Sequence, residues 1–177
     1  MGHLKIIVDH DKIDYSGPFA ANDLLRMIMN FLSERGFDLR QDKDIEQTTS
    51  HGKCIEWQIS PWKRVTDYIR YMFKVRVLGY DIAKTNVEVN GKKSKIETGR
   101  VIIVIDAFME FDYESKWDDK PLFVFIRTMY DYFIYKTYTE RFEHRLVHDA
   151  NHLHDSIEKF LNMYKHYHVI SKIGDGH

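Results

Sequence analysis

The histidines near the carboxyl end of this 177-residue chain have the spacing that most strongly suggests chemistry. His144, His148 and His152 follow one another at intervals of four residues, with Glu140 before them and Asp155 after them. In a helix these side chains share one side. Two histidines four positions apart can bind one zinc ion with a carboxylate as third ligand. His144 and His148 are therefore a candidate metal site, and zinc is the one cofactor that the sequence suggests.

A hydrated polar surface is the alternative for this side of the helix, and we favour it. His144 and His148 do not belong to an HExxH motif, because Arg145, Leu146 and Val147 lie between them. The chain has 10 histidines among 177 residues, so some clustering is expected by chance. The side of a helix that lies opposite its packed side normally points to water.

Two other sets of reactive side chains stand out. Asp9-His10-Asp11 has the residue types of a metal site or an acid-base site. In an extended strand both carboxylates are expected to point away from the histidine, so we interpret the triplet as a strand end or a turn. Cys54 is the single cysteine, which excludes a disulfide within the chain and fits a reducing, cytoplasmic compartment.

Motifs of named reactions are missing: the sequence has no GxSxG, no Walker loop and no GxGxxG. A missing motif does not exclude an enzyme, but we favour a non-catalytic role. The 26 Lys and Arg residues against 27 Asp and Glu give a formal charge of -1, which argues against nucleic-acid binding. No apolar run reaches the roughly 18 residues of a transmembrane helix, and no signal peptide is visible.

Residues 68–113 carry the clearest signal for the elements that position these side chains, because they contain two arms in which the side chains alternate. This period of two predicts two long strands, joined at Asn90-Gly91, the preferred dipeptide of a two-residue hairpin turn. The strands place one continuous set of apolar and aromatic side chains on a single face: Ile69, Tyr71, Phe73, Val75, Val77, Val101, Ile103, Ile105, Ala107, Met109 and Phe111.

Charge sets the register of this hairpin. The register that pairs Arg70 with Glu110 also pairs Lys74 with Asp106, so opposite charges meet across the strands. A two-residue turn at Asn90-Gly91 would pair the strands in a register shifted by one residue from this one. A bulge is therefore expected between the turn and the arms, at Gly79 or at the Thr98-Gly99 pair.

Further elements precede the long hairpin. Residues 4–8 predict a short strand, with a continuation through Ile13 to Tyr15 after Asp9-His10-Asp11 as the alternative. An apolar stripe predicts a helix over residues 18–35, with Ser16 as N-cap and Gly36 as the left-handed residue at its end. Residues 38–60 predict a second hairpin.

Two helical segments follow the long hairpin. Residues 121–135 are apolar or aromatic nearly all round, which is typical of a helix that is buried on several sides or contacts a partner. Residues 138–166 predict a long final helix. Its packing side is a narrow seam of residues spaced by three and four positions: Leu146, Ala150, Leu153, Ile157, Phe160 and Tyr164.

Together these elements predict an α+β fold, with a curved antiparallel sheet of about six strands packed on a long C-terminal helix. We expect a single domain over residues 1–168 and a flexible tail at 169–177. The order of elements resembles the helix-grip arrangement of the START-like, polyketide-cyclase-like (SRPBCC) superfamily. The resemblance implies an apolar cavity between the sheet and the last helix, in a superfamily that binds lipids and other hydrophobic small molecules.

Two functions follow as hypotheses. The first is non-catalytic binding of an apolar or aromatic small molecule or lipid between the sheet and the final helix. Its lining would be Trp57, Tyr71, Phe73, Met109, Phe111 and Tyr113. An ordinary filled core is the alternative for these side chains. The second is a protein partner or a homodimer contact, or else a membrane-surface contact, through Phe123, Phe125, Tyr132 and Phe133.

Overall fold

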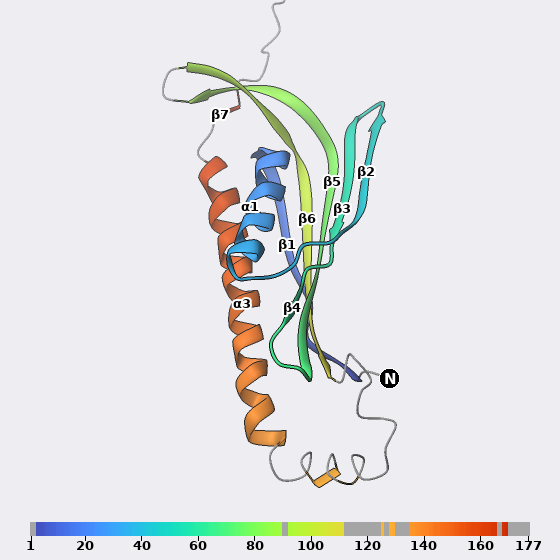
Figure 1. The fold of residues 1–177 in the computed structure, drawn as a ribbon. Helices are drawn as coiled ribbons and strands as arrows, with labels where there is room; N and C mark the ends of the chain where they lie inside the picture. The colour runs from blue at the N-terminus through green and yellow to red at the C-terminus, as the bar shows by residue number, and fades with distance from the viewer. Residues whose placement is uncertain are drawn as a thin grey trace, which may run out of the picture.

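The computed structural model in Figure 1 describes residues 3–89, 92–111, 125, 128–129, 135–165 and 168–169. The elements in chain order are β1 (His3–Phe19), α1 (Ala21–Glu34), β2 (Gln41–Thr49), β3 (Gly52–Ile59), β4 (Trp62–Arg64), β5 (Ile69–Val89), β6 (Lys92–Phe111), α3 (Tyr135–Tyr164) and β7 (His168–Val169). The hairpin turn at 90–91 and most of 121–135 lie outside the described residues.

One sheet contains the seven strands found in the described ranges. Its order is β1-β6-β5-β3-β2, with β4 and β7 paired to β5 beside this path, and every pairing is antiparallel. The sheet is curved, and α1 and α3 lie on the same side of it (Figure 1). The predicted α+β fold, a curved antiparallel sheet packed on a C-terminal helix, is confirmed.

The register of the β5–β6 hairpin is the one that charge predicts. Arg70 lies opposite Glu110 and Lys74 lies opposite Asp106. The Arg70 Nε atom donates a hydrogen bond to Glu110 Oε2 at 2.8 Å. Asp106 forms its ion pair diagonally, with the Arg76 guanidinium at 3.1 Å. Cross-strand charge therefore supports this register over the neighbouring ones.

The expected bulge in this hairpin lies between Tyr80 and Ala83 of β5, opposite Gly99 of β6. Asp81 within it has a φ of 52°. A Cβ atom on Gly99 would lie 2.8 Å from the Tyr80 carbonyl oxygen, so the two backbones are too close for a side chain there. Glycine is therefore required on β6 where the register changes.

β1 is irregular as well, with register shifts on both sides of Val8. His10 has a φ of 52°, and Asp9 contacts the His10 ring. The Asp9-His10-Asp11 triplet is thus a bulge inside a strand, and the expectation of a strand end or turn is wrong. A bulge interrupts the alternation of side chains, which is why Asp9 does not point away from the histidine.

α1 begins later than the sequence predicts, because Ser16 and Pro18 still belong to β1. Ala20 is the N-cap residue and offers no side-chain hydrogen bond. Instead the Ala21 backbone N–H donates to Glu97 Oε2 of β6 at 3.1 Å. This contact satisfies one of the amide groups that a helix start leaves without an intrahelical partner.

The end of α1 agrees with the prediction. Gly36 has a φ of 78°, the left-handed conformation that favours glycine after a helix. The Phe37 backbone N–H donates to the Leu32 carbonyl oxygen at 3.1 Å, so the chain folds back over the last turn.

The core lies between the inner face of the sheet and the two helices. In α3 the predicted seam residues Leu146, Ala150, Leu153 and Ile157 have no exposed surface, and Leu161 at 1% continues the buried stripe. Phe160 and Tyr164, both predicted in the seam, are only half-buried. The buried line of a helix drifts against a strict seven-residue repeat, which explains the change of position.

The second predicted hairpin is also present. β2 and β3 pair antiparallel and join at residues 50–51, and Ile55, Trp57 and Ile59 of β3 are buried. Val169, where a flexible tail was expected to begin, pairs with Val87 in the short strand β7. Within the described ranges, no helix combines the length and apolarity needed to cross a lipid bilayer.

Candidate functional site

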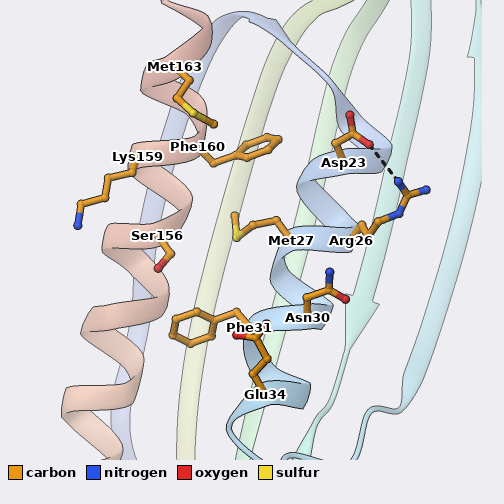
Figure 2. A pocket seen from close by; sticks show the side chains of 10 residues that line it. All are labelled: Asp23, Arg26, Met27, Asn30, Phe31, Glu34, Ser156, Lys159, Phe160 and Met163. Atoms are coloured by element: carbon orange, nitrogen blue, oxygen red, sulfur yellow. Dashed lines mark hydrogen bonds and ion pairs between the residues drawn. The ribbon is translucent and has the colours of Figure 1, made fainter.

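A groove of about 600 Å³ lies between α1 and α3 (Figure 2). Side chains of both helices line it: Asp23, Arg26, Met27, Asn30, Phe31 and Glu34 from α1, and Ser156, Lys159, Phe160 and Met163 from α3. On each helix they recur at intervals of three and four residues, which places them along one side. The groove is therefore formed by two facing helix surfaces.

These surfaces lie beside the stripes that each helix buries. Ile28 and Leu32 of α1 are fully buried, and Met27 and Phe31 come one position before them. In α3, Phe160 likewise comes one position before the buried Leu161. A step of one residue turns the side chain by about 100°. Each helix thus packs one stripe on the sheet and turns the next one toward the other helix.

The inner lining of the groove consists of aromatic rings and methionine side chains. Met27 and Phe31 from α1 and Phe160 from α3 point into the space between the helices (Figure 2). All three are half-buried, and Met163 near one end is 58% exposed. Methionine side chains adapt to ligands of different shape, and aromatic rings offer large apolar surfaces. This lining suits an apolar molecule better than a highly polar one.

The rim of the groove is charged and balanced. Asp23 and Glu34 carry negative charges, whereas Arg26 and Lys159 carry positive charges, and all four side chains are exposed. The Arg26 guanidinium lies 3.4 Å from the Asp23 carboxylate. Since the formal charges cancel, the rim does not select for a strongly charged ligand, but it can hydrogen-bond a polar end.

Arg35 fixes one end of the groove. Its guanidinium carbon lies 3.6 Å from the centre of the Phe31 ring, a cation-π contact. Its Nε atom lies 3.6 Å from Asp149 Oδ1 of α3. Arg35 thereby links the end of α1 to α3 beside the Phe31 ring.

The side chains that the sequence predicts as a ligand lining lie deeper than the groove. Trp57, Tyr71, Phe73, Met109 and Phe111 are each exposed by 3% or less and belong to the core cluster, and Tyr113 lies outside the described residues. The Tyr71 hydroxyl donates a hydrogen bond to the Phe142 carbonyl oxygen of α3 at 2.8 Å. Burial raises the pKa of the Tyr71 phenol. These residues form the floor on which α1 and α3 rest.

Sequence reasoning missed the whole lining of the groove, including Met27 and Met163, and placed Phe160 in the packed seam instead. Met27 and Met163 flank the side of each helix that the helical period predicts to be packed. The sequence signal that was available is the presence of large apolar residues just outside each stripe. It does not show that the two flanks face each other, because that depends on how both helices pack on the sheet.

His144, His148 and His152 lie on the exposed side of α3, as the sequence predicts for a polar face, whereas His154 is half-buried and its Nδ1 atom lies 2.8 Å from Asp11 Oδ2 of β1. His144 and His148, the candidate zinc ligands, are both exposed. The Nε2 atom of His148 lies 3.1 Å from that of His152 rather than facing His144.

The surface predicted to contact a protein partner or a membrane lies largely outside the described residues. They include Phe125 but exclude Phe123, Tyr132 and Phe133. Phe125 is 65% exposed and Met129 is 48% exposed. At these two positions, large apolar side chains are in contact with solvent.

Comparisons of the chain with protein-family models, with curated proteins and with solved structures find no match in any of the three. The helix-grip resemblance remains a prediction from the order of elements, and the function has to be argued from the groove itself.

Proposed function

We propose that the protein binds an apolar or aromatic small molecule, such as a lipid, in the groove between α1 and α3. The observation that carries this proposal is the groove itself. Its volume of about 600 Å³ is within the range of roughly 300 to 1,000 Å³ that small-molecule sites occupy. Its inner lining of Met27, Phe31 and Phe160 combines with a polar rim, which is the usual composition of such sites.

The groove supports the proposal better than the inner face of the sheet does. Tyr71 and Phe73, expected to contact a ligand there, are 1% exposed and packed within the core. A ligand on the sheet would have to displace α3, and the hydrogen bond from Tyr71 to Phe142 opposes this movement. The groove can be filled without moving either helix.

The ligand class follows from the lining. An apolar or planar body would contact Met27, Phe31 and Phe160, and a polar end would stay at the rim near Arg26 or Lys159. Because the groove is open to water on one side, such a ligand is amphipathic rather than wholly apolar. The main favourable term would be removal of apolar surface from water.

Titration with 1-anilinonaphthalene-8-sulfonate, an aromatic sulfonate whose fluorescence rises in apolar sites, tests the proposal. We expect Met27→Glu to weaken binding of this probe tenfold or more, since it places a negative charge in the apolar lining and repels the sulfonate. Met29→Glu is the matched control, because Met29 lies on the same helix, is also half-buried and does not line the groove. Equal effects of the two variants would contradict a groove site.

The natural ligand can be sought directly. Protein purified from its host is denatured, and the extract is analysed by mass spectrometry for a co-purifying amphipathic molecule. Wild-type protein should carry it, and the Met27→Glu variant should be depleted relative to Met29→Glu. An extract without any such molecule would count against the proposal.

Self-association is a second candidate function, favoured by the exposure of Phe125 and Met129. Large apolar side chains in contact with water are typical of protein interfaces. Light scattering tests this function, and Phe125→Asp should convert a dimer to a monomer. A wild-type protein that is monomeric at every concentration would argue against it.

A further inference from the structure

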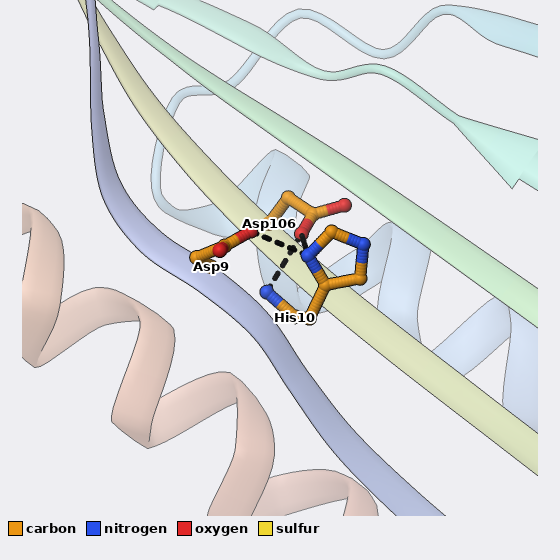
Figure 3. A group of neighbouring side chains, drawn as sticks. All are labelled: Asp9, His10 and Asp106. Carbon is orange, nitrogen blue, oxygen red and sulfur yellow. Dashed lines mark hydrogen bonds and ion pairs between the residues drawn. The ribbon is translucent and has the colours of Figure 1, made fainter.

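The bulge in β1 brings three potential metal ligands together. Val8 pairs with Ala107 and Asp11 pairs with Ile105, so two residues of β1, Asp9 and His10, lie opposite a single residue of β6, Asp106. A regular strand would put Asp9 and His10 on opposite faces. The bulge, with the left-handed conformation of His10, lets both side chains approach Asp106 (Figure 3).

The ligand atoms have a spacing that suits one ion. His10 Nδ1, one oxygen of Asp9 and one oxygen of Asp106 all lie within 4.8 Å of one another. The His10 Nδ1 atom is 3.5 Å from Asp106 Oδ1 and also contacts Asp9 Oδ1. Bonds of about 2.1 Å from a tetrahedral zinc ion hold its ligand atoms about 3.4 Å apart. The measured separation of His10 and Asp106 is close to this value.

Asp106 is the fixed member of the set. It is only 4% exposed, and the Arg76 guanidinium holds its Oδ2 atom at 3.1 Å. Its Oδ1 atom accepts a hydrogen bond from the His10 backbone N–H at 2.8 Å and keeps one lone pair toward the bulge. One carboxylate oxygen is therefore held in place beside the imidazole.

Asp9 and His10 form the open side of the set, with each side chain 68% exposed. With a neutral imidazole, the two carboxylates and the Arg76 guanidinium sum to one negative charge. A divalent cation would be attracted by this charge and would leave the set with one positive charge, and its remaining coordination positions would face water. The occupant that competes with a metal is a proton on the imidazole.

We propose that Asp9, His10 and Asp106 bind a divalent transition-metal ion of the zinc class. The ligand set of one imidazole nitrogen and two carboxylate oxygens suits zinc, whereas calcium and magnesium prefer oxygen ligands alone. Asp106 lies in the same alternating set as Ile102 and Val104, opposite to the buried Ile103 and Ile105. The site is thus on the sheet face away from α1 and α3, and it does not depend on the groove.

Zinc binding to protein without a purification tag tests the proposal, with a fluorescent zinc chelator as competitor. We expect wild-type protein to bind one zinc ion at this site with a micromolar or tighter dissociation constant. His10→Ala and Asp9→Asn should each weaken binding tenfold or more. Both positions are exposed, so circular dichroism should show an unchanged fold in each variant.

The controls use the other close pair of imidazoles. His148 and His152 have Nε2 atoms 3.1 Å apart, and a His148→Ala, His152→Ala double variant removes this pair. The double variant should retain the zinc ion. The proposal is overturned by wild-type protein that binds no zinc at micromolar concentration, by a smaller effect of either His10→Ala or Asp9→Asn, or by zinc binding that is lost in the double variant.

Cobalt absorption gives a second readout. Co²⁺ bound by one nitrogen and two oxygen ligands should give visible d–d bands that disappear in His10→Ala. Bands that persist in this variant would place the ion elsewhere and also overturn the proposal.

Discussion

The Tyr71 hydroxyl group on β5 donates a hydrogen bond to the Phe142 carbonyl oxygen of α3 at 2.8 Å. Tyr71 is 1% exposed and Phe142 is half-buried, so this contact lies at the edge of the core, where it links the sheet to the helix that covers it. The sheet and the helix are thus joined by a directional contact as well as by apolar packing.

Removing this hydrogen bond should destabilise the fold. Tyr71→Phe keeps the ring and loses the donor, and we expect the free energy of unfolding to fall by about 1 kcal/mol. Urea denaturation measures the change. Tyr80→Phe is the matched control, because Tyr80 is 43% exposed. Equal destabilisation by the two variants would show that the Tyr71 hydroxyl contributes no more than a surface hydroxyl.

Stability should also fall in alkaline solution because of Tyr71. Burial raises its pKa above the usual value of 10.0, so the folded protein keeps a proton that the unfolded chain loses. The unfolded state then binds fewer protons, and the free energy of unfolding decreases as the pH rises above about 10. Urea midpoints on both sides of that pH should differ less for Tyr71→Phe than for wild-type protein. An identical difference would contradict the expectation.

Asp14 should titrate at unusually low pH. Hydrogen bonds from Arg100 at 2.9 and 2.6 Å hold the Asp14 carboxylate and lower its pKa from 3.8 to about 2. The pair contributes stability above the unfolded-state pKa, and this contribution is lost as the pH falls through about 2.

Carboxyl carbon NMR titration of Arg100→Gln should show the pKa of Asp14 return toward 3.8. Lys12→Gln should shift it less, since Lys12 Nζ is 3.5 Å from Asp14 and is a weaker cause. A larger shift in Lys12→Gln would reverse this order of causes.

Gly99→Ala should destabilise the β5–β6 hairpin. The added Cβ atom would lie 2.8 Å from the Tyr80 carbonyl oxygen and 3.0 Å from Ile82 Cα, and both are backbone atoms that cannot rotate away. We expect a loss of about 1 to 3 kcal/mol in the free energy of unfolding. Thermal or urea unfolding measures it. A Gly99→Ala variant as stable as wild-type protein would contradict the close approach.

The hairpin register could be predicted because its signals are local and repeat many times. Side-chain alternation fixes which face each residue occupies, and a slip by one residue would turn every side chain over. The pairing of Arg70 with Glu110 then selects one register among those that remain. The helix end at Gly36 could be predicted equally well, because glycine is the usual residue type directly after the last turn of a helix.

The start of α1 and the grouping of the site residues could not be predicted, because both depend on contacts between residues that are far apart in the sequence. The partner of the Ala21 amide is Glu97, which is 76 positions away in the chain. Asp106 is 96 positions from His10, and a bulge brings them together. The groove depends on the relative positions of two helices, which the pattern of neither helix contains.

The irregularity between Tyr80 and Ala83 divides the longest hairpin into two parts with different tolerance to mutation. Residues 69–80 and 100–111, on the core side of the irregularity, pair in a single register. Beyond it, the arm continues past the sheet and bends across the top of the molecule (Figure 1). The register changes at this point, so the pairing of the distal arm is separate from that of the core part. One residue can therefore be added to each strand of the distal arm without turning any core side chain outward. The arm is therefore the place where an epitope or a fluorescent reporter could be inserted while the rest of the chain keeps its shape.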